Sequence, residues 1–96
     1  MKKGQCEEAM ELEEVFCKQR MKILKLIDKL GSINVTDIAR KTGANFTSTS
    51  KHLRILEAEG ILRVHVYGRV RMYRYNESSA KAKAVKNLIE TWELNE

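Results

Sequence analysis

Residues 35–76 decide the fold and read VTDIARKTGANFTSTSKHLRILEAEGILRVHVYGRVRMYRYN. The first part predicts a short helix over residues 36–42 and a longer one over residues 46–59, with Gly43 in the turn between them. Both helices carry the residues expected at helix ends, with N-caps at Thr36 and Asn45 and a stop at Gly60. Two helices joined by a tight glycine-containing turn are typical of a helix-turn-helix over residues 35–59.

A β-hairpin is expected next, over residues 61–75. Residues 61–67 and 70–75 are rich in β-branched and aromatic side chains, and Gly68-Arg69 suits a two-residue turn. If Tyr67 pairs with Val70, one face of the hairpin carries Leu62, Val64, Val66, Arg71, Tyr73 and Tyr75. That register leaves Val70 and Met72 on the outer face, so a longer or bulged turn stays open as an alternative.

Helices are expected on both sides of this segment, over residues 6–30 and 79–94. The first has one apolar stripe made by Ala9, Leu12, Phe16, Ile23, Ile27 and Leu30, and a second that predicts a partner surface. The last helix has its own stripe of Val85, Leu88, Ile89 and Trp92, at a chain end where one small domain has little core left to cover. The predicted homodimer interface therefore contains Cys6, Met10, Cys17, Met21, Leu24, Leu88 and Trp92.

The charge is unevenly distributed along the chain. The 96 residues suit a single domain and carry a net charge of +5. Residues 7–14 hold five glutamates, whereas residues 38–76 hold eight Lys or Arg against two acids, so the middle of the chain is the part expected to meet phosphates. No run of 18 apolar residues occurs, and glutamates follow the opening lysines, so we expect a cytoplasmic protein without a membrane partner.

The expected order is helix, helix-turn-helix, hairpin, helix. With the motifs TDIARKTG, SKHLRILEAEGIL and YGR…YRY, residues 35–76 resemble the winged-helix regulators of the ArsR and MarR kind. The flanking helices and short length are also similar to small regulators from archaea and their viruses. The resemblance implies a mainly α fold with a small β-hairpin, the winged helix-turn-helix. It further implies that residues 46–59, the recognition helix, lie in the DNA major groove, and that the hairpin over residues 61–75, the wing, approaches the minor groove. The terminal helices are implied to build a dimer.

Helix periodicity separates the two sides of residues 46–59. Thr49, Leu53 and Leu56 fall on the buried side, and the outward side, expected to contact DNA, holds Thr47, Ser48, Ser50, Lys51 and Arg54. Phe46 is interpreted as a hydrophobic anchor, with contact to a thymine methyl as the alternative. On the hairpin, Arg69 at the tip is the expected minor-groove contact, with phosphate contacts from Arg71 and Arg74. The competing interpretation is that these polar side chains only solvate the surface.

Three side chains carry further hypotheses. His52 is interpreted as a packing residue or a contact to the DNA backbone, with metal ligation together with His65 as a minor alternative. Cys6 and Cys17 are too far apart along one helix to bond to each other, but antiparallel partner helices would allow two symmetric disulfides between chains. Buried apolar packing is the favoured interpretation of both cysteines, and redox sensing is a third.

Taken together, the sequence predicts a homodimeric, sequence-specific binder of double-stranded DNA that acts as a transcriptional repressor. The alternative is an architectural DNA-binding protein with weak sequence preference, since the recognition helix has few bidentate base readers. A winged helix used for protein–protein contact is less consistent with the basic wing. The residues show no catalytic constellation, phosphate loop or metal-ligand spacing, so no enzyme activity, cofactor or metal is expected.

Overall fold

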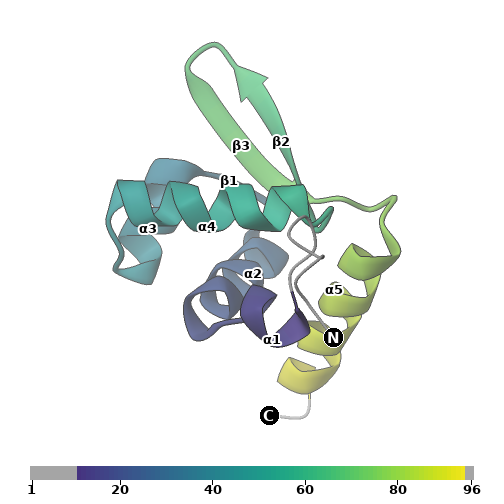
Figure 1. Ribbon diagram of the computed structural model, residues 1–96. Coiled ribbons are helices and arrows are strands. Elements are labelled where there is room, and N and C mark those ends of the chain that lie inside the picture. The colour runs from purple at the N-terminus through teal and green to yellow at the C-terminus, as the bar shows by residue number, and fades with distance from the viewer. Residues whose placement is uncertain (1–10, 95–96) are drawn as a thin grey trace.

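The computed structural model describes residues 11–94, and Figure 1 shows their arrangement. Five helices and a three-stranded antiparallel sheet surround one hydrophobic core. In chain order the elements are α1 (Leu12–Val15), α2 (Lys18–Leu30), β1 (Ser32–Asn34), α3 (Val35–Thr42), α4 (Phe46–Ala58), β2 (Leu62–Tyr67), β3 (Val70–Tyr75) and α5 (Ala80–Leu94). The expected fold, mainly helical with a hairpin, is confirmed. Among these residues no helix is long and apolar enough to cross a membrane.

The first predicted helix is interrupted. Its described part forms α1 and α2, and Cys17 caps α2 with an extended backbone, at φ −72° and ψ 167°. Arg20 supplies a physical reason for the break, because its guanidinium donates hydrogen bonds to the carbonyl oxygens of Glu14 and Val15. Those carbonyls are thereby engaged at the point where a continuous helix would use them. The expected residues 6–10 lie outside the described part of the chain.

The helix-turn-helix is confirmed, with one corrected boundary. Helix α3 begins after Asn34, whose Oδ1 accepts a hydrogen bond from the Asp37 N–H at 2.8 Å, so Thr36 is not the N-cap. Gly43 ends α3 at φ 75°, in the left-handed region that suits glycine. Asn45 is the N-cap of α4 as predicted, its Oδ1 accepting from the Ser48 N–H at 2.7 Å.

The hairpin has the expected register, with Tyr67 opposite Val70 and an unbroken ladder down to Leu62 and Tyr75. The bulged alternative is not adopted. Gly68 has φ +62°, and since no described non-glycine residue has positive φ, the two-residue turn has the pattern of type II′. Strand β1 pairs with β3 on its other edge, an element the sequence did not predict. Figure 1 shows the hairpin extending beyond α4.

The core lies where α2, α3, α4, α5 and the sheet meet. Its fully buried side chains include Ile23, Leu24, Ile27, Ile38, Leu53, Leu56 and Tyr73. Tyr75 is tied to α2, because its hydroxyl donates to the Leu24 carbonyl oxygen at 2.8 Å, and burial raises the pKa of that hydroxyl. Helix α5 contributes Ala82, Val85 and Ile89. The base of the hairpin is therefore fixed to the same core as α4.

Candidate nucleic-acid interface

Helix α4 has two chemically distinct sides. Thr49, Leu53 and Leu56 have no exposed surface, which confirms the predicted buried side. On the other side Thr47, Lys51 and Arg54 are exposed, at spacings of four and three residues that form one stripe. Ser48 and Ser50 are half-buried at the edges of that stripe. The helix thus presents hydroxyl and cationic groups outward on a rigid, well-packed element.

Phe46, the first residue of α4, does not anchor the helix. Its side chain is 57% exposed, because it stands at the helix start beyond the core that holds Leu53 and Leu56. The anchor interpretation is therefore wrong for this chain. The alternative, apolar contact with a base, stays a prediction.

The wing brings two of its predicted arginines to its outer half. Arg69 lies in the turn and is exposed, and Arg71 follows on β3, opposite Val66. Arg71 shares a strand face with Tyr73, the face that packs on the core. Its guanidinium donates to the Tyr73 hydroxyl at 3.2 Å and lies 5.9 Å from the ring centre. Tyr73 therefore restrains the Arg71 side chain, whereas Arg69 is exposed in the turn at the tip of the hairpin.

Arg74 is not brought together with the other two. It lies near the base of the hairpin, between Ser32 and Arg63, on the face turned away from the core. Its guanidinium is 3.9 Å from the Glu77 carboxylate. A contact between Arg74 and DNA bound at the wing tip is therefore not favoured by this geometry.

The outer wing also exposes apolar side chains that sequence reasoning did not assign to any site. Val66, Tyr67 and Val70 are 59%, 64% and 44% exposed. Tyr67 also stacks with His65, with the ring centres 6.1 Å apart. A signal was present in the sequence, since Tyr67 and Val70 flank the Gly68-Arg69 turn and therefore stand at the end of the hairpin. Side chains at the tip must then face solvent or a ligand on both faces.

His52 is partly buried and hydrogen-bonded to Arg20, and it does not belong to the exposed stripe. Its Nδ1 accepts a hydrogen bond from Arg20 Nε at 3.0 Å. Arg20 is only 8% exposed, and through its bonds to the last carbonyls of α1 it joins α1, α2 and α4. Burial and the neighbouring charges of Arg20 and Lys51 lower the pKa of His52. The described residues contain no cluster of three metal-ligating side chains.

A second surface is apolar and lies on α1, the start of α2, and α5. Leu12, Leu88 and Trp92 are 71%, 56% and 69% exposed. They border two hollows of about 430 and 340 Å³, both lined by Met21 and Leu88. Of the other predicted interface residues, Cys17 is half-buried, and Cys6 and Met10 lie outside the described part of the chain. The assignment of Leu24 to the dimer interface is wrong, because its side chain is wholly buried in the core of the single chain.

The geometry so far is that of a winged helix with a basic, hydroxyl-rich α4 and an arginine-bearing wing. The family model described as "Bacterial regulatory protein, arsR family" matches residues 17–64, half of the chain. The chain belongs to the arsR family of bacterial regulatory proteins. The match runs from the N-cap of α2 into β2 and so includes the whole helix-turn-helix.

Solved structures share the fold of this arsR-family chain. The homodimeric winged helix-turn-helix DNA-binding domain of a possible ArsR-family regulator from Mycobacterium bovis is 26% identical, with a TM-score of 0.67 over 80% of this chain and 68% of that one. The transcriptional repressor PagR of Bacillus anthracis is 23% identical, with a TM-score of 0.68 over 88% and 95%. HlyU from Vibrio cholerae, in its reduced form, is 18% identical, with a TM-score of 0.72 over 92% and 90%. No curated protein sequence matches the chain.

Proposed function

We propose that this arsR-family chain is a homodimeric, sequence-specific binder of double-stranded DNA that represses transcription. The observation that carries the proposal is the exposed stripe of α4, where Lys51 and Arg54 stand beside hydroxyl side chains on a helix whose other side is fully buried. An α-helix fits the major groove, and side chains on one face of it meet base edges and phosphates. A dimer bound across a promoter would exclude other proteins from it, which is the simplest route to repression.

The proposed contacts follow from position. Thr47, Ser48 and Ser50 lie in the first turns of α4 and would donate to phosphates or bases, and Arg54 would read a base or a phosphate. The wing would add Arg69 in the minor groove and Arg71 on the backbone. Arg74 is left out of this set because it lies near the base of the hairpin, away from Arg69 and Arg71.

The exposed apolar surface supports the dimer. Leu12, Leu88 and Trp92 are large apolar side chains with more than half of their surface in solvent, and apolar patches of this kind mark interaction sites. Pairing of α1 and α5 about a two-fold axis would cover them. In such a dimer the two α4 helices would read half-sites about one turn of DNA apart, roughly 34–36 Å.

The architectural alternative retains one specific observation in its favour. The exposed stripe of α4 has Arg54 as its only bidentate base reader, and the remaining groups are hydroxyls and Lys51. A surface of that kind suits phosphate contacts as well as base contacts. Salt dependence therefore separates the two candidates.

Substitutions in the α4 stripe test the proposal. We expect Arg54→Gln to weaken binding to a selected site by about tenfold or more and to relax the preference at one base pair. Lys51→Gln should weaken binding to all sequences equally and reduce the salt slope by about one. The exposed Lys83 of α5 gives the matched control Lys83→Gln, which should leave affinity unchanged. DNA affinity is measured by fluorescence anisotropy. Equal losses of affinity in all three variants would mean that binding depends on net charge alone and would overturn the assignment to α4.

A further inference from the structure

A second cationic site lies on the side of α2 that faces away from the core. Lys18, Lys22, Lys25 and Lys29 are spaced by four, three and four residues, so they form one stripe along the helix. The buried side chains of α2, such as Ile23 and Ile27, lie on its opposite side and share the core with α4. The stripe is therefore separated from the α4 surface by the core, and the proposed DNA contacts do not use it.

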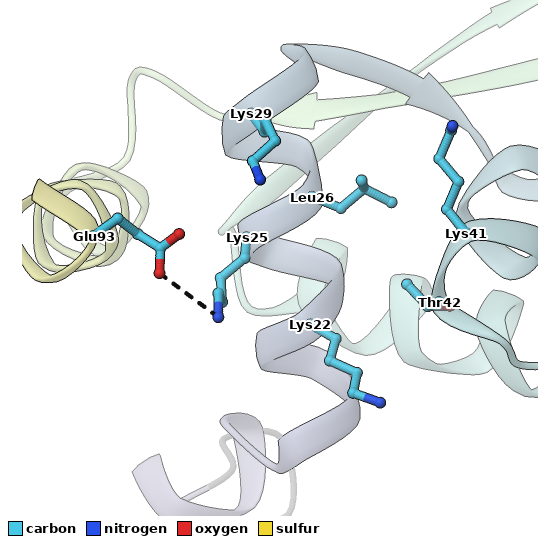
Figure 2. Close-up of a pocket in the computed structure, with 7 residues that line it drawn as sticks. All are labelled: Lys22, Lys25, Leu26, Lys29, Lys41, Thr42 and Glu93. Atoms are coloured by element: carbon cyan, nitrogen blue, oxygen red, sulfur yellow. Dashed lines mark ion pairs between the residues drawn. The ribbon is translucent and has the colours of Figure 1, made fainter. Parts of the chain in front are cut away.

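The stripe forms part of a pocket of about 290 Å³ built by three elements (Figure 2). Lys22, Lys25, Leu26 and Lys29 come from α2, Lys41 and Thr42 from α3, and Glu93 from α5. Figure 2 shows Lys25 and Lys29 on the side of α2 toward α5, and Leu26 reaching toward α3, where Lys41 stands. Four ammonium groups and one carboxylate give the lining a net charge of +3.

The one acid of the lining is loosely held. Glu93 lies 3.7 Å from Lys25 Nζ, and the two side chains are 41% and 52% exposed. Exposed ion pairs of this kind contribute little and are screened by salt, so a stronger anion can displace the carboxylate. The Thr42 hydroxyl is already used, since it donates to the Ile38 carbonyl oxygen at 2.8 Å. Recognition in this pocket therefore depends on the ammonium groups.

The chemistry of the cations points to phosphate. The wing uses arginines, whose planar forks match carboxylates and phosphates in a fixed geometry, whereas this pocket uses only lysines. Flexible point charges spread across α2 suit a chain of several phosphate groups better than a single compact anion. We propose that the pocket binds the polyphosphate chain of a small molecule, either a nucleoside triphosphate or inorganic polyphosphate. A bound chain would replace the Lys25–Glu93 contact and so act on both α5 and the helix-turn-helix.

Titration calorimetry on the full chain, without DNA, tests this site independently of the proposed function. The probes are tripolyphosphate and ATP, at one moderate and one high salt concentration. The test variant is the double substitution Lys22→Gln and Lys29→Gln. The matched control is Arg63→Gln with Lys83→Gln, which removes two exposed cations that lie outside both the lysine stripe and the pocket lining. Circular dichroism establishes that both variants are folded.

We expect saturable binding of one polyphosphate per chain, weakened about tenfold or more in the test variant and less than threefold in the control. Equal binding of tripolyphosphate and ATP would identify the phosphate chain as the recognised group, and tighter binding of ATP would add a nucleoside contact such as one with Leu26. Absence of saturable binding, or equal losses in both variants, would show that the lysines only solvate α2. A loss of DNA affinity in the test variant without polyphosphate would also overturn the proposal, because the surface would then belong to DNA.

Discussion

At the residue scale, the Arg20–His52 contact determines how this protein should respond to acid. Arg20 is a nearly buried cation whose partners are carbonyl oxygens and the neutral imidazole of His52. Only a neutral imidazole can accept the hydrogen bond from Arg20 Nε, so its proton is on Nε2. Protonation would place a second cation beside Arg20 and remove the acceptor. The link between α1, α2 and α4 therefore depends on a neutral His52.

Stability should consequently fall as the pH is lowered below the ordinary histidine value of 6.5. The pKa of His52 is lowered in the folded chain, so the unfolded chain binds its proton first, and proton uptake favours unfolding until the pH passes below the folded pKa. Urea unfolding between pH 7.5 and 5.5 measures this slope. His52→Asn retains an acceptor without a titratable group and should flatten it. Asp28 does not contribute to this fall in stability, because burial and the neighbouring Glu90 raise its pKa in the folded chain, so proton uptake by Asp28 favours folding. An unchanged slope in His52→Asn would therefore assign the fall in stability to groups other than His52.

At the element scale, one side-chain hydrogen bond caps the amino end of α4. Asn45 Oδ1 accepts from the Ser48 N–H, and Ser48 lies in the first turn that is proposed to meet DNA. Asn45→Ala removes this cap and should reduce the free energy of unfolding by about 0.5–2 kcal/mol. Asn45→Asp keeps an acceptor and should retain most of the stability. Thermal unfolding compares the two, and equal losses would mean that the cap bond does not hold the helix start.

The two N-caps also show what sequence reasoning can and cannot predict. Asn45 can be predicted as the N-cap because it is the first capping residue after the turn at Gly43, ahead of Thr47 and Ser48. At α3, Thr36 was chosen because it stands before Ile38, but the three-residue strand β1 ends at Asn34 and places the cap there. So short a strand has no periodicity of its own, and its pairing with β3 is a long-range contact that local pattern does not reveal.

The same reasoning applies to the first helix and to the site. The hydrophobic periodicity of the sequence continues through residues 16 and 17 and predicts one helix. Arg20 instead binds the carbonyl oxygens of Glu14 and Val15, and the helix breaks between α1 and α2. The break changes which side chains of α1 and α2 share a face. The wrong assignment of Leu24 has a different cause: it lies within the continuous helix α2, whose buried side includes Ile23, Leu24 and Ile27 and is therefore wider than a single stripe. On α4, where the helix is continuous, the buried and exposed sides were predicted correctly. Contacts with DNA or a second chain stay predictions, because they depend on the shape and charge of the partner's surface as well as on this chain.

At the scale of the whole molecule, the apolar surface of α1 and α5 should control the oligomeric state. Leu88→Glu places a carboxylate in the surface that lines both hollows, and we expect it to weaken dimerisation at least tenfold, because a buried, unpaired charge is costly. Val66→Glu is the matched control, since Val66 is equally exposed but lies on the wing. Sedimentation equilibrium gives the dissociation constants. A dimer that tolerates Leu88→Glu would place the interface elsewhere.

The proposed function requires that the chain reads DNA as a two-fold dimer through α4. Selection of bound fragments from genomic DNA, followed by sequencing at two salt concentrations, tests it most directly. We expect an enriched motif with two-fold symmetry, half-sites about 10 base pairs apart, and enrichment that persists at the higher salt. Binding that collapses with salt and enriches no motif would favour the architectural alternative, and no binding at either concentration would contradict the DNA-binding claim itself.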